Sequence, residues 1–495
     1  MTASIRPSGP PPADAPSRTD PFVHGLAEAI GGPLGEHAVR RSTGPTGLPR
    51  FWTAARIVLA LCCLTLTLHW VQKLPCSDGA WTNHKQYTQF CYTDVLALYY
   101  AEGLDKGEIP YLDHAVEYPV LTGAMMGLLG LPIHAYGERN PGFNQGEAFY
   151  HTNALVLLAL AVATCAVILS LRRRRPWDAA MFALSPALLV TATVNWDFLA
   201  IGLTAFGLYA WAKRHPALAG VLLGLGTAAK LWPGFVFIPL LVLCVRAGKV
   251  PEWLSAATIG VATWAAVNLP VALLNKNNWG QFFALSSSRG VDWGTLWYIG
   301  DHFPHNNGQY GLSPFQWLAD HIPTLNNLTY VLFALGWGAI GALVLYAPRR
   351  PRLAQVVFLA VAVFLIFNKV WSQQFVLWLI PLAVLARPRW GAFLAWQAAE
   401  ICYFLAFYGE LLGASSGKQV FPEGVFVLAS GMRITTLAVL CWFVVRDVLR
   451  PELDPVRETY ADDPDGGVLD GAPDVFVLGG VSRGGTRPRS PALRG

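Results

Sequence analysis

The chain has 495 residues, of which 54% are hydrophobic and 14% are charged, and its formal net charge is +5. Apolar runs long enough to cross about 30 Å of hydrocarbon recur along most of its length, which excludes an ordinary soluble domain and predicts an all-α polytopic membrane protein. The basic residues lie beside these apolar runs, where membrane topology explains them better than a nucleic-acid partner does, so no nucleic-acid binding is predicted.

The two ends of the chain differ in composition from its centre. Residues 1–49 and 451–495 are rich in proline, glycine and charge and lack apolar periodicity, so they are expected to be disordered cytoplasmic tails. The first apolar run starts at Phe51, after a long polar stretch without a small-residue cleavage site, which favours a retained anchor over a signal peptide. Residues 50–450 are therefore expected to form the membrane domain.

Basic clusters that follow apolar runs mark the cytoplasmic side of a membrane protein. Here they are Arg172–Arg175, Lys213/Arg214, Arg246/Lys249, Arg349/Arg350/Arg352, Arg387/Arg389 and Arg446/Arg450. Every cluster faces inward if the chain crosses the membrane at residues 52–71, 150–171, 178–194, 198–212, 216–230, 232–247, 252–274, 327–347, 353–368, 371–386, 390–408 and 424–446. This gives about twelve transmembrane helices, some of them short, with both termini in the cytoplasm.

The topology requires that the apolar stretch 119–135 does not cross, because a crossing there would place Arg172–Arg175 outside. Its prolines and glycines and its modest length favour a helix that lies in the interface or dips partway in. Residues 72–149 then form a first large external loop with short interfacial helices, and residues 275–326 form a second one.

The unusual polar groups fall on the side opposite to the arginines. They are the acids of the first loop, "NWD" at 195–197, "KLWP" at 230–233, "GDHFPHNNG" at 300–308 and "NKVWSQQ" at 368–374. Charged groups at membrane depth are costly unless they line a wet cavity or form pairs, so their convergence predicts a polar site at the external face. The alternative is that these loops are simply polar.

Asp94 is the candidate general base. Thr93 reads as the N-cap of a short helix that ends at Gly103, with Asp94 in its first turn. There the helix dipole favours the ionised carboxylate, which is then available as a proton acceptor, although aspartate is common in first turns for stability alone. Asp113 and Glu117 come just before the helix expected at 119–135, where they line a site or form a polar rim.

Three candidate cations are expected to face the external side. Lys230 and Lys369 sit at the external ends of spans, with Gln373 about one helical turn after Lys369, and His302 lies in the second loop. A lysine in such a place would seek an anion, and snorkelling to the interface is the alternative. Arg433 is different, because it falls mid-span opposite Glu400 on the preceding helix, and a buried ion pair is expected between them.

The cysteines give no metal-binding pattern. Six of the eight lie in apolar spans, where a thiol behaves as a small hydrophobe. Cys76 and Cys91 share the first external loop, where an oxidising exterior makes a disulfide plausible, although two cysteines in one loop form a weak pattern. The sequence has no Cys/His ligand spacing, Walker loop or dinucleotide fingerprint, so neither a metal nor a nucleotide cofactor is expected.

The stretch "TDVLALYYAEGLDKGEIPYLDHAVEYPVLTG" resembles the first-loop signature of polyprenyl-phosphate-dependent GT-C glycosyltransferases of the family 87 (DUF2029-type) α-mannosyltransferase kind. In these enzymes an Asp is followed by a short helix with Tyr, then by Gly, by Pro-Tyr and finally by Tyr-Pro-Pro. This chain has Tyr118-Pro119-Val120 at the final motif, so Val120 replaces the last proline. "FNKVWSQQFVLWLIPLAVL" resembles a late-span segment of these enzymes, usually with Ser-Pro-Gln where this chain has Ser372, Gln373 and Gln374. The resemblance extends loosely over residues 50–450.

The resemblance implies an inverting transfer of a sugar, with mannose expected, from a polyprenyl-phosphate donor to a glycolipid or glycan acceptor at the outer face of the plasma membrane. Asp94 matches the catalytic aspartate of the first loop and would take the acceptor proton. Fixed cations should stabilise the departing phosphate. The site would then comprise Asp94 as base, Lys230, Lys369 and His302 as phosphate ligands, and Asp113, Glu117, Tyr118, Asp197 and Gln373 as substrate contacts. The other partners are membrane lipids, and no metal is expected.

A lipid-linked-sugar flippase, or another transporter without transferase activity, is the alternative function. It would also have a polar cavity and many spans, but its polar groups should lie near the bilayer midplane, often on broken helices. A scaffold protein for envelope assembly would leave the one-sided cations unexplained. The sequence does not distinguish mannose from arabinose or another pentose, because sugar choice depends on a few hydrogen bonds in the pocket.

Overall fold

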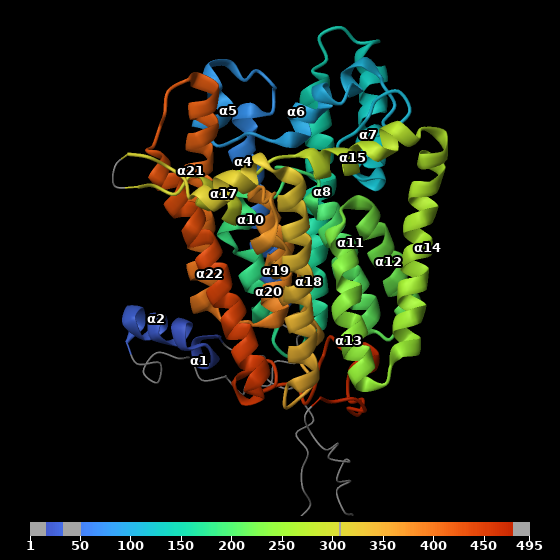
Figure 1. The fold of residues 1–495 in the computed structure, drawn as a ribbon, viewed down its shortest axis with the longest axis vertical. Coiled ribbons are helices and arrows are strands. Elements are labelled where there is room, and N and C mark those ends of the chain that lie inside the picture. The colour runs from blue at the N-terminus through green and yellow to red at the C-terminus, as the bar shows by residue number, and fades with distance from the viewer. Residues whose placement is uncertain (1–15, 33–50, 306–307, 479–495) are drawn as a thin grey trace, which may run out of the picture.

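The computed structural model describes residues 16–32, 51–305 and 308–478 and is drawn in Figure 1. Within these ranges the protein is a bundle of α-helices without a β-strand, and its only β-type pairings are the isolated bridges Pro110–His114 and Pro304–Tyr310. The all-α polytopic class expected from the composition is confirmed.

Six helices of the described chain are long and apolar enough to cross a membrane. They are α4 (Ala54–Lys73, extended by the 3₁₀ turn η1, Leu74–Cys76), α7 (Val120–Gly137), α8 (Gln145–Leu171), α14 (Val250–Leu274), α18 (Ile322–Tyr346) and α22 (Glu423–Leu449). Helices satisfy their own backbone hydrogen bonds, which is what allows such segments to lie in hydrocarbon.

Shorter apolar helices complete the bundle. They are α11 (Asp197–Ala212), α12 (Pro216–Ala229), α13 (Phe237–Ala247, after η5, Trp232–Val236), α19 (Leu353–Phe367) and α20 (Val376–Ala386, after η6, Gln373–Phe375). The long helix α21 (Trp390–Ser416) packs antiparallel to α22. Close contact of α12 with α14 depends on small residues, because a Cβ at Gly220 would collide with the carbonyl oxygen of Ala256.

Short helices lie mainly at the two ends of the bundle. They are α1 (Pro16–Thr19), α2 (Pro21–Gly31), η2 (Thr82–His84), α5 (Lys85–Thr88), α6 (Asp94–Ala101), η3 (Leu104–Lys106), α15 (Lys276–Ser288), α16 (Leu296–Asp301), α17 (Ser313–Asp320), η7 (Pro451–Leu453) and η8 (Gly467–Leu469). In Figure 1, α5, α6, α7 and α15 gather at one end, whereas α1, α2 and the segment after α22 lie at the other.

Residues 178–194 do not form the single span expected there. They make η4 (Pro176–Ala179), α9 (Ala180–Ala183) and α10 (Pro186–Thr191), and the chain breaks at Leu184 and Ser185. Ser185 caps α10, because its side chain accepts a hydrogen bond from Leu188 N, and the proline that follows cannot continue the preceding helix.

The stretch expected to lie in the interface forms the continuous helix α7. By length and composition it is one of the six helices able to cross a membrane, and Figure 1 shows it beside the upper part of α8, at the end of the bundle that carries α5 and α6. Thr122 near its start donates a hydrogen bond of 2.8 Å to the carbonyl of Ala229, the last residue of α12. That α7 does not cross remains a prediction.

The expected disorder of the C-terminal tail is wrong for residues 451–478. Arg352 and Asp454 form a fully buried ion pair of 2.7 Å, and Arg172 is paired in the same way with Asp465. Arg172 and Arg352 also donate to the carbonyl of Leu385 at the end of α20, so they satisfy backbone groups that the helix leaves open. The segment folds because its aspartates match buried arginines, a pairing that composition alone does not reveal. Residues 479–495 lie outside the described residues.

Part of the N-terminal tail is also folded. The Asp20 side chain accepts hydrogen bonds from Phe22 N and Val23 N and so caps α2, and its other oxygen accepts from the backbone N–H of Trp390 at the start of α21. The expectation of disorder is therefore wrong for residues 16–32, while 1–15 and 33–50 lie outside the described residues.

Candidate active site

The N-terminus of α6 is built as the sequence predicts. Thr93 has extended backbone geometry and its hydroxyl oxygen accepts a hydrogen bond from Val95 N, while the helix begins at Asp94 and ends at Ala101, slightly before the expected end at Gly103. The Thr93 hydroxyl also donates to the carbonyl of Thr193 at 2.7 Å, and Asp94 N donates to the carbonyl of Val194 at 2.7 Å. The first turn of α6 is thereby fixed to the turn that precedes α11.

Asp94 sits in a cluster of hydrogen-bond donors. Asn195 donates from Nδ2 to Asp94 Oδ2 at 2.8 Å and to the hydroxyl of Tyr118 at 2.5 Å, and the Tyr92 hydroxyl also hydrogen-bonds the carboxylate. Burial raises the pKa of the Asp94 carboxyl, whereas the bonds from Asn195 and Tyr92 and the charge of Lys230 act in the other direction. A raised pKa brings a general base closer to operating pH, where proton transfer is most efficient.

Lys230 and Asp197 form a buried ion pair beside this cluster. The ammonium lies 2.8 Å from Asp197 Oδ1, which also accepts a hydrogen bond of 2.6 Å from the indole of Trp378. The ammonium lies 5.7, 5.2 and 5.8 Å from the ring centroids of Tyr118, Phe375 and Trp378, within the range of cation–π attraction. Asp197 Oδ2 is buried and has no hydrogen-bond partner among the described residues.

Glu117 extends the cluster toward solvent. Its side chain is exposed, hydrogen-bonds the Tyr118 hydroxyl and interacts electrostatically with Asp94, Arg289 and Lys230. Burial of the carboxyl group beneath neighbouring atoms and repulsion from Asp94 raise the pKa of Glu117. Five residues singled out from the sequence therefore converge, and these are Asp94, Glu117, Tyr118, Asp197 and Lys230.

Lys369 and Gln373 lie on the loop that leads into α20. The Lys369 ammonium donates to the carbonyls of Ser287 and Arg289 at 3.1 and 2.6 Å, so it contacts the chain that carries Arg289. Gln373 hydrogen-bonds the Tyr408 hydroxyl, and Tyr408 interacts electrostatically with Asp94. The loop is held by Arg433.

Arg433 forms the buried pair with Glu400 that the sequence predicts, at 3.0 Å. Its guanidinium also donates to the carbonyls of Trp371 and Ser372, which fixes the backbone just before Gln373. The pair is therefore structural, and it supports the loop from within the bundle.

His302 and Asp113 have other neighbours. His302 stacks on Tyr298, with ring centroids 4.0 Å apart, and lies 3.3 Å from Asp301. Asp113 is exposed and accepts a hydrogen bond from Ile109 N within its own loop. No contact in the described part of the chain joins either residue to Asp94, so the structure does not bring them into the cluster.

Two residues of α4 that the sequence analysis missed support the cluster. The ring of His69 accepts at Nε2 from Thr193 N at 3.0 Å, so Nε2 carries no proton, and Nδ1 donates to the carbonyl of Leu189 at 2.8 Å. One turn later, Lys73 donates to the carbonyls of Phe90 and Tyr92. Both side chains are buried. Their spacing of four residues on one helix face was the available signal.

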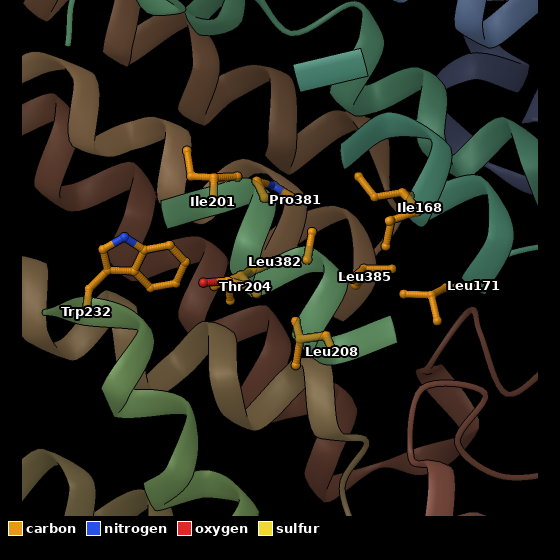
Figure 2. Close-up of a pocket in the computed structure, with 11 residues that line it drawn as sticks. Ile168, Leu171, Ile201, Thr204, Leu208, Trp232, Pro381, Leu382 and Leu385 are labelled. Carbon is orange, nitrogen blue, oxygen red and sulfur yellow. The ribbon is translucent and has the colours of Figure 1, made fainter. Parts of the chain in front are cut away.

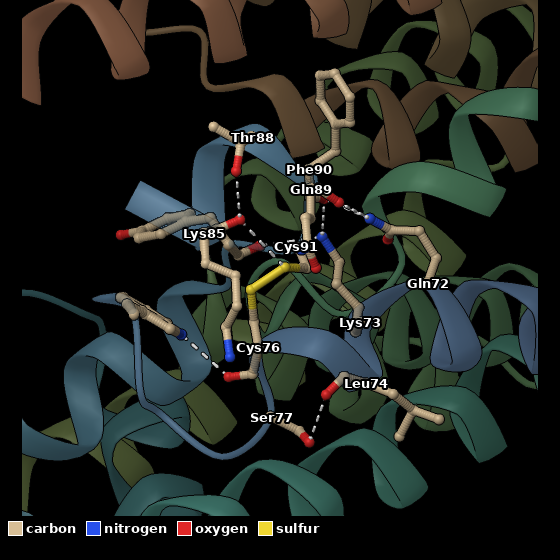
Figure 3. The surroundings of a disulfide bond; sticks show 12 residues. Gln72, Lys73, Leu74, Cys76, Ser77, Lys85, Thr88, Gln89, Phe90 and Cys91 are labelled. Carbon is tan, nitrogen blue, oxygen red and sulfur yellow. Dashed lines mark hydrogen bonds between the residues drawn. A yellow bond between two sulfur atoms is a disulfide. The ribbon is translucent and has the colours of Figure 1, made fainter. Parts of the chain in front are cut away.

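The disulfide left open by the sequence is formed between Cys76 and Cys91. Figure 3 shows it beside Lys73, whose amine points toward the carbonyl of Phe90. The bond ties the end of α4 to the chain just before Tyr92 and Asp94. Loop closure of this kind restricts the backbone that presents both side chains.

Figure 2 shows a largely apolar cavity within the bundle. Ile168, Ile201, Trp232 and Leu382 are among its lining residues, and Trp232 stacks on Trp378 with ring centroids 5.5 Å apart. The cavity has no charged lining residue, so it suits neither a sugar nor a phosphate. Trp378 in turn donates to Asp197, and apolar surroundings of this kind strengthen the electrostatic interactions of the Lys230–Asp197 pair.

Among the residues that the structure describes, no three His, Cys, Asp or Glu side chains are grouped as a metal site. The cluster contains the half-buried carboxylate of Asp94, which can accept a proton. It also contains the buried ammonium of Lys230, which can stabilise negative charge that develops beside it. Arg289 at the edge adds a second positive charge, which the sequence analysis did not select because it lies in a polar loop.

Comparisons with known proteins indicate sugar transfer. Residues 147–368 match glycosyltransferase family 87, a segment that contains Asp197 and Lys230 and begins after Asp94. GPI mannosyltransferase 1 of Saccharomyces cerevisiae is 22% identical over 386 residues, which cover 71% of this chain and 88% of that protein. Together with the all-α membrane fold, these findings indicate a membrane glycosyltransferase that is similar to family 87 over residues 147–368.

Proposed function

We propose that the protein transfers a sugar, with mannose as the expected one, from a polyprenyl-phosphate donor to a glycolipid or glycan acceptor, with inversion at the anomeric carbon. The proposal is supported most directly by the position of Lys230 beside the base. Asn195 bonds both Asp94 and the Tyr118 hydroxyl, and the ring centroid of Tyr118 lies 5.7 Å from the Lys230 ammonium. The family match supports sugar transfer, and the mannosyltransferase relative supports the choice of sugar.

Asp94 acts as the general base in this reaction. The acceptor hydroxyl oxygen attacks the anomeric carbon and forms the new glycosidic bond, while its proton passes to the Asp94 carboxylate. The bond between the anomeric carbon and the phosphate oxygen breaks, and its electron pair leaves with the polyprenyl phosphate. One displacement inverts the configuration, and no metal or other cofactor is invoked.

Lys230 stabilises the negative charge that develops on the departing phosphate, because it is a fixed cation in apolar surroundings. Arg289 and Lys369 lie at the edge of the same cluster, where they add positive charge. A sugar hydroxyl would supply the hydrogen bond that the buried Asp197 Oδ2 lacks among the described residues. Glu117 and Tyr118 contact the substrate at the open side.

The proposed orientation places this end of the bundle at the outer face of the cytoplasmic membrane and both termini in the cytoplasm. The Cys76–Cys91 disulfide favours an oxidising compartment for the first loop. Arg172 and Arg352 lie at the opposite end of the bundle. Because positively charged residues are enriched on the cytoplasmic side of membrane proteins, that end is assigned to the cytoplasm.

Asp94→Asn tests the proposal. The full chain is purified in detergent and incubated with a panel of radiolabelled polyprenyl-phosphate sugars and a membrane lipid extract, and both labelled product and free polyprenyl phosphate are measured. Loss of a general base lowers the rate by about 10²–10⁴-fold. Asp320→Asn, at an exposed position of the second large loop, is the matched control and should retain full activity.

Near-normal turnover by a folded Asp94→Asn protein would remove the base assignment. If the wild-type protein releases no polyprenyl phosphate from any donor but moves labelled donor across a liposome bilayer, the transporter alternative holds instead.

A further inference from the structure

Lys73 is a buried amine that the proposed reaction leaves without a role. Its side chain is 1% exposed, and its ammonium donates to the carbonyls of Phe90 and Tyr92 at 3.2 and 3.0 Å (Figure 3). In the described part of the chain, no carboxylate forms a direct ion pair with it. Two carbonyls satisfy its N–H groups but supply no countercharge, and an uncompensated buried charge is costly.

Asp94 is the carboxylate with which Lys73 interacts electrostatically. The Tyr92 carbonyl held by Lys73 is two residues from Asp94, and His69, one turn earlier on α4, holds Thr193 beside Asn195. One face of α4 thus fixes both chain segments that build the base.

The two lysines near Asp94 differ in whether they already have a carboxylate partner. The titratable and charged groups that face it are Tyr92, Glu117, Tyr118, Asp197, Lys230, Tyr408 and Lys73. Glu117 and Asp197 oppose ionisation of Asp94, and the Lys230 ammonium is already bonded to Asp197. Lys73 is the cation of this group that has no acid of its own.

We propose that Lys73 is a positioning residue of this site, whose ammonium holds the Tyr92 carbonyl and keeps the Asp94 carboxylate ionised while Lys230 is engaged by Asp197 and the donor phosphate. This inference rests on the proposed function. It divides the two lysines by task, because Lys73 acts on the base and Lys230 acts on the leaving group.

Lys73→Gln separates charge from hydrogen bonding, since glutamine keeps an N–H donor for the carbonyls. The measurement is the pH profile of kcat/KM for transfer from radiolabelled polyprenyl-phosphate mannose to a membrane lipid extract, whose acid limb reports the pKa of the free base. An opposite charge lowers a carboxyl pKa, so loss of the Lys73 charge should move the acid limb to higher pH, by up to about 1 unit. At pH values below the limb the rate should fall by up to about tenfold, and the alkaline plateau should be kept.

Lys85→Gln is the matched control, because Lys85 lies in the same loop, pairs with Asp78 near the surface and should leave the limb in place. An unmoved limb in folded Lys73→Gln, or an equal loss of activity at every pH, would overturn the proposal. Lys73→Arg retains the charge, so a raised limb in this variant would refute the proposal however well the glutamine variant folds, and a raised limb in Lys73→Gln together with a wild-type limb in Lys73→Arg supports it. Absence of transfer by the wild-type protein would instead refute the proposed function.

Discussion

Asp454→Asn should destabilise the protein even though Asp454 lies outside the membrane helices. Its carboxylate accepts hydrogen bonds from Arg352 Nε at 2.7 Å and Nη2 at 3.0 Å, and both side chains are 0% exposed. Removal of one partner of a buried pair costs about 3–5 kcal/mol, and asparagine keeps part of the hydrogen bonding, so we expect about 3 kcal/mol. This corresponds to a fall of about 3 °C in Tm for a chain of this size.

The measurement is thermal unfolding of the full chain in detergent, followed by the fluorescence of its 19 tryptophans. Burial opposes ionisation of Asp454, but the Arg352 guanidinium more than offsets it and lowers the pKa of this carboxyl. Its stabilisation is therefore present above the unfolded carboxyl pKa and is lost as pH falls through the folded value, so wild type and variant should converge in acid. Glu452→Gln, two residues away and exposed, is the control. Equal Tm values for Asp454→Asn and wild type at neutral pH would show that the segment does not hold the bundle together.

Three further predictions concern the first loop and the site. Lys230→Met should lower kcat/KM for the donor about 10²-fold, as measured by initial rates over a range of donor concentrations, because a fixed cation is lost where charge develops. Burial raises the pKa of Glu102 to about 7, so the native state binds more protons than the unfolded chain between its usual value and about pH 7. Stability should therefore fall as pH rises through that window, and Glu102→Gln should flatten the dependence of Tm on pH. Replacement of Cys76 and Cys91 by serine removes the closure of a loop of 15 residues and should cost about 3 kcal/mol, seen as a lower Tm and faster proteolysis of the loop.

Local features of the site could be predicted from the sequence. The Thr93 cap and the start of α6 at Asp94 follow from capping chemistry that involves neighbouring residues only. The Arg433–Glu400 pair follows from the depth of two charges on antiparallel helices, where neither would be tolerated alone. Such inferences need only helix geometry and the cost of unpaired charge.

Contacts between distant segments could not be predicted. Asn195 bonds Asp94 because the turn between α10 and α11 lies against the start of α6, and no periodic pattern encodes that turn. Lys73 resembles a lysine that snorkels at the end of an apolar run, whereas the disulfide and the carbonyls of the first loop enclose it. The C-terminal segment was missed for the same reason, since the spacing of its aspartates has meaning only against arginines on other helices.

The two ends of the bundle use buried charge in opposite ways. At the end that carries the C-terminal segment, Arg172 and Arg352 each have an aspartate as counterion and bond helix-terminal carbonyls, although Arg172 Nε has no hydrogen-bond partner among the described residues. At the other end, Lys230 shares Asp197 with an indole donor, one oxygen of that carboxylate has no partner among the described residues, and Lys73 has no direct ion pair in the same part of the chain. Buried polar groups without partners lower the stability of a protein. Such groups are tolerated where a bound substrate supplies the missing hydrogen bonds and charges. The charge pattern therefore favours the Asp94 end as the place of chemistry for a physical reason that does not depend on the family resemblance.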